Sequence, residues 1–572
     1  MEPDGLHVSL GNYSGVVADA VAQAWQHNVV QRIWNKDASL WKSEAAHQKI
    51  ICNSLGWLNV ASEISAVSDD LVAFADQIRG PAGFKQVMLC GMGGSSLCPE
   101  VIRQTLGQQS GYPSLLVLDS TDPDVLASFA KQVDIDHCLF IIASKSGTTT
   151  EPLVFYKYWY NQVAQRTPNA GGSFVAITDP GTRMVEMATA DNFRRIFLNR
   201  SDIGGRYSAL SYFGMVPAAL MGVDIGKLID RAEEMMRSCS AESSGEGNPG
   251  LLLGAIVGEC ANAGRDKITI VTDHHVEALG LWIEQLIAES TGKEGKGILP
   301  VNGEAIGPPS VYADDRLFVS ITVGNGGGET ERSLKALEAA GHPVIYRTLK
   351  DSYDLGGEFF LWEFATAFAG WRLSINPFDQ PNVQESKDAT RELLEYFTRE
   401  RKLPEQNFLV GDGLLAVYAD EQTREILPST SVREVLRAHL AGLKPRDYIA
   451  LLDYFEQTPE IEASIQTIRT QLRNVTKCAT TTGYGPRFLH STGQLHKGGP
   501  DTGVFIQLTA SDKLDLPIPG EPYTFSILKQ AQALGDYRSL ALRGRRAIRV
   551  DLGEDVLVGL ERLRKTIDQA LA

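Results

Sequence analysis

Short apolar runs, each followed by a loop of small polar residues and then by a helical pattern, recur along this chain from about residue 85. Lys85–Cys90, Cys138–Ala143 and Arg194–Leu198 are the first three runs. Strands that alternate with helices pair in parallel and are covered on both faces, so their sequences are apolar throughout. The pattern therefore predicts an α/β fold with a doubly wound parallel sheet over residues 81–240.

The same pattern starts again after a segment rich in Gly, Ser and Glu near Cys239–Asn248. Lys267–Val271, Arg316–Val323 and Pro343–Arg347 are its predicted strands, and helical patterns lie between and after them. We expect a second doubly wound sheet over residues 249–400.

The two ends of the chain carry other patterns. Residues 12–80 have apolar side chains at helical spacing, which predicts a helical cap over residues 1–80. Several apolar runs near the other end predict strands with helices between them, and hence a C-terminal α/β region over residues 401–572. These runs are Asn407–Tyr418, Tyr448–Tyr454, Val504–Thr509 and Ala547–Val550.

Charge and cysteine content narrow the functional class. The formal net charge of −16 argues against non-specific nucleic-acid binding, because such proteins need a basic face. No run of about 18 apolar residues predicts a membrane span, and Met1–Gly11 lacks the basic start of a secretory signal. The seven cysteines are scattered and form no C-x-x-C pair. This usage is typical of reduced thiols, so we expect a cytoplasmic protein without a disulfide frame or a structural zinc ion.

The loop after Cys138–Ala143 is dense in hydroxyl groups and precedes a predicted helix. A phosphate group needs many hydrogen-bond donors, and the dipole of a helix start stabilises its charge. We therefore expect a phosphate site, although a hydroxyl-rich helix cap is the alternative; a cap normally needs one such residue. The candidate residues are Ser144, Lys145, Ser146, Thr148 and Thr149.

The loop Cys90–Ser96 is rich in glycine, which lets backbone approach a ligand closely. It lacks both the G-x-G-x-x-G spacing and the lysine of nucleotide-binding loops, so nucleotide binding is not indicated. Gly94 and Ser95 are its candidate ligand contacts.

Together these two loops resemble the sugar-isomerase (SIS) domain, which binds phosphosugars. Three further segments resemble motifs of phosphoglucose isomerases, namely Gly204–Ser211, Gln285–Lys293 and Asn376–Lys387. The motifs stand in family order over about residues 85–390, and their combination is specific. The resemblance implies two SIS domains that hold a sugar phosphate in the crevice at the carboxyl ends of their strands.

The reaction of that family moves a proton between C2 and C1 of a sugar through a cis-enediol. One carboxylate over that face can perform both transfers, and the resemblance assigns this role to Glu289. Arg206 would stabilise the enediolate because a guanidinium is always charged. Lys387 is assigned to ring opening. Gln285 lies one turn before Glu289 on the same helix face, and Gln380 is assigned to a sugar hydroxyl or the phosphate.

Leu489–Gln494 is similar to the family's L-H-S-x-G-Q segment around the ring-opening histidine. The usual family order is Glu, His, Lys, whereas this chain runs Glu289, Lys387, His490. The C-terminal region that carries His490 resembles instead the isomerase part of transaldolase–phosphoglucose isomerase fusion proteins. His496 competes for the role, and whether the histidine acts in its own chain or in a partner stays open.

We therefore expect an aldose–ketose isomerase that interconverts glucose 6-phosphate and fructose 6-phosphate. The alternatives are a bifunctional glucose/mannose 6-phosphate isomerase and a non-catalytic phosphosugar-binding SIS protein. The chemistry requires no cofactor and no metal, and the neighbouring His274 and His275 lack the further ligands of a metal site. A small sugar phosphate is the expected partner, with no nucleic acid and no membrane. A homodimer and a functional link to transaldolase stay open.

Overall fold

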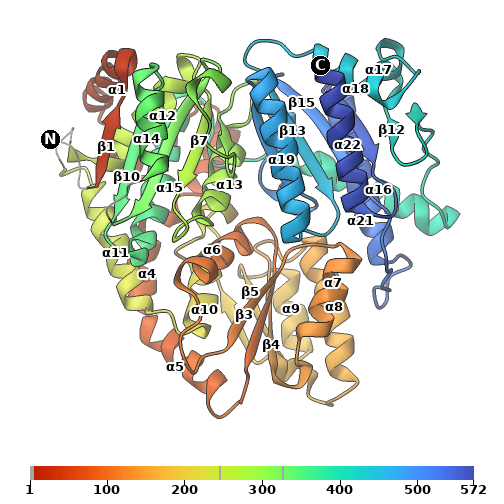
Figure 1. Cartoon of the computed structure of the whole chain (residues 1–572). Coiled ribbons are helices and arrows are strands. Elements are labelled where there is room, and N and C mark those ends of the chain that lie inside the picture. Colours follow the sequence, from red (N-terminus) through yellow and green to blue (C-terminus); the bar gives the residue numbers. More distant parts are fainter. Residues whose placement is uncertain (1–4, 244–246, 325–327) are drawn as a thin grey trace.

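The computed structural model describes residues 5–243, 247–324 and 328–572. Three β-sheets, each with helices packed against it, occupy three regions of the molecule (Figure 1). The fold is thus α/β, as the sequence predicts. Of the segment predicted to separate the first two sheets, residues 244–246 lie outside the described residues.

The first sheet is wholly parallel and confirms the predicted doubly wound pattern. Alternate residues of its strand β2 pack into different cores, with Val87 and Leu89 on one face and Met88 and Cys90 on the other. The strands, in sheet order, are β3 (Ser114–Leu118), β2 (Gln86–Cys90), β4 (Cys138–Ala143), β5 (Phe174–Thr178) and β6 (Arg195–Leu198). The helices that follow them include α6 (Leu97–Leu106), α7 (Pro123–Gln132), α8 (Thr150–Ala164), α9 (Arg183–Ala190), α10 (Tyr212–Leu220) and α11 (Ile225–Ser238).

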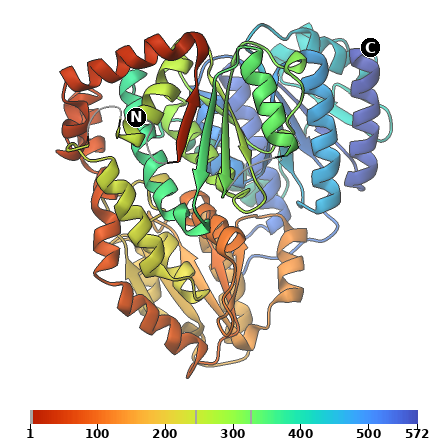
Figure 2. The ribbon, with the colours of Figure 1, turned by 60° about the vertical axis from the view of Figure 1, so that its left-hand side comes forward.

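The second sheet is parallel except for one edge strand that comes from the start of the described chain. This strand, β1, pairs antiparallel with β10, so part of the segment predicted as a helical cap belongs to the second sheet (Figure 2). The strands, in sheet order, are β1 (Leu6–Ser9), β10 (Val344–Leu349), β9 (Arg316–Val323), β7 (Lys267–Thr272) and β8 (Leu299–Val301). Its helices include α12 (Pro249–Asn262), α13 (Leu279–Thr291), α14 (Glu329–Ala339) and α15 (Leu355–Arg372).

Residues 12–80 are predominantly helical, as predicted. Many of their apolar side chains are buried in one core with α10, α11 and α15, and Trp57 and Leu58 are fully buried there. The helices are α1 (Ser14–Gln26), α2 (Val29–Trp34), α3 (Ala45–Cys52), α4 (Val60–Ser65) and α5 (Ser68–Arg79).

The C-terminal region forms a third sheet whose four longest strands are parallel. The strands, in sheet order, are β11 (Val410–Gly411), β12 (Ala416–Tyr418), β16 (Arg546–Asp551), β15 (Gly503–Thr509), β13 (Tyr448–Tyr454) and β14 (Ala479–Tyr484). The helices before, between and after them are α16 (Val383–Glu400), α17 (Glu421–Ile426), α18 (Val432–Ala441), α19 (Pro459–Thr476), α20 (Gly493–Gly498), α21 (Phe525–Leu542) and α22 (Val556–Leu571).

One predicted strand of this region is wrong. The run Asn407–Tyr418 contains an antiparallel pair of short strands rather than one strand. The turn between them starts at Asp412, whose carboxylate accepts hydrogen bonds from the backbone of Leu414 and Leu415, and Gly413 adopts φ +89°. Aspartate and glycine together favour such a reversal of the chain.

The first and third sheets share a core. Phe155 and Trp159 of α8 belong to the same buried cluster as Leu393 of α16 and Phe525 and Leu528 of α21. The residue limits of the four predicted regions therefore stay a prediction, because packing continues across them. Within the described residues, no helix is long and apolar enough to cross a lipid bilayer.

Candidate functional site

A cavity of about 390 Å³ opens where loops of the first and third sheets meet α13 and α16. The loops that follow β2 and β4 form one wall, and His490, from the loop after β14, forms another. Carboxyl ends of parallel strands are the usual place for ligand sites in such sheets. All the predicted site residues except Thr148 line this cavity, and Thr148 lines a larger cavity of about 680 Å³ beside it.

The hydroxyl-rich loop bends sharply at Gly147, whose φ is +66°, before α8 begins. Ser144 Oγ donates to Thr149 Oγ1 at 3.0 Å and accepts from the Gly147 N–H at 3.2 Å. Ser146 Oγ and Thr148 Oγ1 lie 3.0 Å apart, within hydrogen-bond distance. The loop is thus held by its own hydroxyls at the start of a helix, the place that favours an anion.

Lys145 belongs to this loop, but its charge is already paired. Its Nζ donates to the Asp179 carboxylate and, at 2.9 Å, to the backbone oxygen of Ser201. Burial of Asp179 raises the pKa of its carboxyl above the usual value. Lys145 therefore borders the cavity as part of an ion pair rather than as an unpaired cation.

The glycine-rich loop packs against the segment that carries Arg206. A Cβ at Gly94 would lie 1.9 Å from the backbone oxygen of Gly205, so only glycine fits there. Ser95 follows in the same short turn and is buried. This close approach brings the two loops to one side of the cavity.

Glu289 and Arg206 lie together on the cavity wall. Arg206 Nη1 is 3.5 Å from Glu289 Oε1, and Gln285 donates to Glu289 Oε2 at 3.1 Å. The guanidinium is buried and also donates to Ser290 Oγ at 2.7 Å and to Gln380 Oε1 at 3.0 Å. These bonds fix the cation beside the carboxylate, with Gln380 as one of its acceptors.

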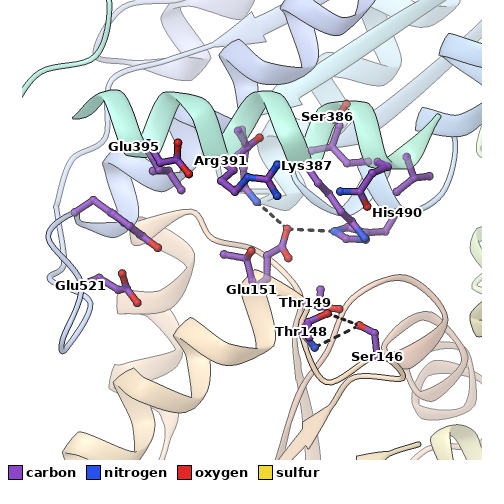
Figure 3. A pocket seen from close by; sticks show the side chains of 18 of the residues that line it. Ser146, Thr148, Thr149, Glu151, Ser386, Lys387, Arg391, Glu395, His490 and Glu521 are labelled. Carbon is purple, nitrogen blue, oxygen red and sulfur yellow. Dashed lines mark hydrogen bonds and ion pairs between the residues drawn. The ribbon is translucent and has the colours of Figure 1, made fainter. Parts of the chain in front are cut away.

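His490 pairs with the carboxylate of Glu151, which is not among the predicted site residues. Its Nε2 is 3.2 Å from Glu151 Oε1; His490 lines both cavities, and Glu151 lines the larger one. Figure 3 shows Glu151 facing the His490 ring, with Lys387 and Arg391 extending from α16. Burial raises the pKa of Glu151, but the charge and hydrogen bond of His490 outweigh burial and hold the pKa below its usual value. Lys387 is exposed and lines both cavities.

His496 lies elsewhere. It is buried among the rings of Tyr448, Phe488 and Phe505, and neither of its ring nitrogens has a hydrogen-bond partner within the described residues. Burial lowers the pKa of His496 well below its usual value. The geometry therefore favours His490 over its competitor.

Three further polar residues lie next to predicted site residues and were not among them. Glu151 directly follows the hydroxyl-rich loop, and its charge at a helix start was a usable signal. Lys293 is the last residue of the segment Gln285–Lys293. Burial, together with the charge of Arg206, lowers the pKa of Lys293 to about 8, and its Nζ donates to Asp379 at 2.8 Å. Gln532 donates to Glu151 at 2.7 Å, and no local sequence pattern indicated that Gln532 lies there.

Carboxylate oxygens of Asp122, Asp124 and Asp512 lie close enough together to bind a cation. Lys529 bonds two of these carboxylates, donating to Asp122 at 2.8 Å, and so supplies a positive charge there. His274 and His275, whose rings are 3.8 Å apart, take no part in this group.

Comparisons with known proteins show which family and which relatives the chain is similar to. A family model described as phosphoglucose isomerase matches residues 44–299. A probable glucose-6-phosphate isomerase of Methanococcus maripaludis is 26% identical over 391 residues, which is 61% of this chain and 86% of that protein. A glucose-6-phosphate isomerase of Methanocaldococcus jannaschii is 29% identical over 350 residues, 54% of this chain and 85% of that protein.

Solved structures share the fold. A glucose-6-phosphate isomerase from Chlamydia trachomatis superposes with a TM-score of 0.55 at 17% identity, covering 69% of this chain and 88% of that one. A hypothetical protein from Thermus thermophilus gives a TM-score of 0.56 at 21% identity, covering 68% of this chain and 99% of that one.

Proposed function

We propose that this chain, which belongs to the phosphoglucose isomerase family, interconverts glucose 6-phosphate and fructose 6-phosphate. The observation that carries the proposal is the buried Glu289 carboxylate, 3.5 Å from the Arg206 guanidinium, in a cavity bordered by a hydroxyl-rich helix start. A base beside a fixed cation suits a reaction that passes through an enediolate.

The phosphate occupies the loop Ser144–Thr149, where hydroxyls and the first N–H groups of α8 can donate to it. This contact orients the sugar so that its C1 and C2 lie over Glu289. The carboxylate removes the proton from one carbon, and Arg206 stabilises the negative charge that develops on oxygen. A second proton passes between the hydroxyl oxygens on C2 and C1 while Glu289 returns its proton to the other carbon, so that no proton is gained or lost overall.

Ring opening takes place at the part of the cavity wall that His490 forms. His490 moves a proton between the ring oxygen and the hydroxyl that becomes the carbonyl, because an imidazole can donate and accept near neutral pH. Glu151 orients the imidazole and stabilises its charged form, which is the usual effect of a carboxylate beside a histidine. Lys387 contributes a nearby positive charge from α16.

One chain supplies Glu289, Lys387 and His490 to the same cavity. We propose that a single chain can therefore complete its own site. We also place the protein in the cytoplasm, because every cysteine is a free thiol and all but Cys52 are buried.

A coupled assay on the purified chain tests the function. Fructose 6-phosphate should yield glucose 6-phosphate, and Glu289→Gln should abolish most of the yield. Mannose 6-phosphate formed at a comparable rate would establish the bifunctional alternative. Tight binding of fructose 6-phosphate without turnover would establish a phosphosugar-binding protein and overturn the proposal.

A further inference from the structure

Two side chains from the C-terminal region meet on one oxygen of Glu151. His490 Nε2 lies 3.2 Å from Glu151 Oε1, and Gln532 Nε2 donates to the same oxygen at 2.7 Å. Gln532 belongs to α21, stands 381 residues from Glu151 in sequence and is only 3% exposed. A buried, uncharged donor thus holds the carboxylate on the side of the histidine.

The orientation of the Gln532 amide is fixed from both ends. Thr121 Oγ1, which is fully buried, donates to Gln532 Oε1 at 2.6 Å. If the amide turned over, its oxygen would face the negatively charged Glu151, and Thr121 could no longer donate to it. Glu151 and Thr121 together therefore select the orientation in which the NH₂ group faces the carboxylate.

The same face of α21 is anchored one turn earlier. Lys529 donates to Asp122 Oδ2 at 2.8 Å, and Asp122 directly follows Thr121 in the loop after β3. Residues three apart lie on one side of a helix. The docking of α21 on the first sheet thus places Gln532 within reach of Glu151.

The charged groups around Glu151 determine how strongly the Gln532 hydrogen bond can affect the protonation of Glu151. His490 approaches from the loop after β14, and Lys387 lies on α16. Arg391 on α16 lines the same cavity, as do Glu395 and Glu521 (Figure 3). From α21, the residue that faces Glu151 is Gln532. A hydrogen-bond donor beside a carboxylate stabilises the ionised form of that carboxylate.

We propose that Gln532 is a positioning residue for ring opening: it keeps Glu151 ionised and aimed at His490, with Thr121 holding the other end of its amide. This inference rests on the proposed isomerase function. It assigns a specific task to the C-terminal region beyond carrying His490, because the region also orients the partner of that histidine.

The test replaces Gln532 with methionine, which has a similar volume but no donor. The turnover number for fructose 6-phosphate should fall roughly 10-fold to 100-fold, the scale of one hydrogen bond to a charged group, with little change in KM. The acid limb of the pH–rate profile should move to higher pH, because the pKa of Glu151 rises when it loses a donor to its charged form. Gln507→Met is the matched control, since Gln507 is also buried and donates to α21 but does not contact Glu151.

Thr121 gives a second, independent variant. Thr121→Val removes the hydroxyl and should shift rate and profile in the same direction by a smaller factor, whereas Thr121→Ser keeps the hydroxyl and should restore both. A fructose 6-phosphate analogue without the C5 hydroxyl cannot cyclise, and its turnover should be unchanged in every variant. A crystal structure of Gln532→Met should show the Glu151 carboxylate turned away from His490 Nε2.

The inference is overturned if Gln532→Met lowers only the melting temperature, as Gln507→Met would, and leaves the acid limb in place. It is also overturned if the open-chain analogue slows as much as fructose 6-phosphate, or if Glu151 keeps its position in the crystal. Absence of isomerisation by the unaltered chain would instead overturn the proposed function, and the crystal structure would still decide the role of Gln532 in positioning Glu151.

Discussion

The side-chain amide of Gln285 donates to the backbone oxygen of His490 at 2.8 Å, although the two residues are 205 positions apart in the chain. The same nitrogen donates to Glu289 at 3.1 Å. Gln285 therefore ties the carboxylate on α13 to the C-terminal segment that carries the histidine. This tie explains how a histidine that follows the lysine in sequence can reach the cavity within its own chain.

Replacing Glu289 with glutamine should preserve substrate binding and lower the turnover number by roughly two to four orders of magnitude, the usual scale for general acid–base catalysis. The amide has nearly the same shape but cannot accept the proton. Glu277→Gln is a suitable control, because Glu277 is exposed just before α13. Retention of more than about a tenth of the activity by Glu289→Gln would show that another group is the base.

Alanine variants of the two histidines should differ in their turnover of cyclic and open-chain substrates. His490→Ala should slow turnover of the cyclic sugar and spare proton exchange on an open-chain analogue, because only ring opening loses its acid and base. His496→Ala should change the rate much less but lower the melting temperature, since it empties a buried aromatic site. Equal loss on both substrates in His490→Ala would contradict the assignment to ring opening.

The hydroxyl-rich loop should act mainly on affinity. Alanine at Ser144 and Thr149 removes hydroxyls that bond each other at 3.0 Å and that border the cavity. Because phosphate contacts hold substrate and transition state alike, we expect KM to rise with a smaller change in turnover. Steady-state kinetics with fructose 6-phosphate measure both, and an unchanged KM would remove this loop from the phosphate site.

Two glycine positions on the facing loops should respond very differently to alanine. At Gly94 the new Cβ would lie 1.9 Å from the Gly205 oxygen, so the loops must separate and both stability and activity should fall. At Gly204 the nearest atom would be 3.7 Å away, which is an ordinary contact, so Gly204→Ala should be tolerated. Thermal melts and the isomerase assay compare the two; a stable, active Gly94→Ala protein would show that the loops do not need this approach.

Local sequence determined much of the scaffold. The strands Cys138–Ala143, Arg316–Val323 and Tyr448–Tyr454 are predicted with the bounds that the structure gives them, because both faces of each are buried and their apolar runs end where the chain reaches a loop. β3 and β5 were not predicted, although they belong to the same sheet as β4. The resemblance to a family motif selected Gln285 and Glu289, and helix geometry puts these two residues, which are four apart in the chain, on one face.

Tertiary structure decided which residues of different sheets come into contact. Ser144–Thr149, Glu289, Lys387 and His490 lie on separate segments of the sequence, and tertiary packing brings them to one cavity. α16 and α21 share a core with the first sheet, and Gln285 on α13 bonds the backbone of His490. Glu151 and Gln532 show the limit most clearly. Their hydrogen bond joins residues that are 381 positions apart, and the sequence around neither residue indicates the other as its partner. Periodicity reports which face of an element is buried, whereas a contact between distant elements depends on how whole sheets dock, and that is set by the sum of many buried contacts rather than by any one segment.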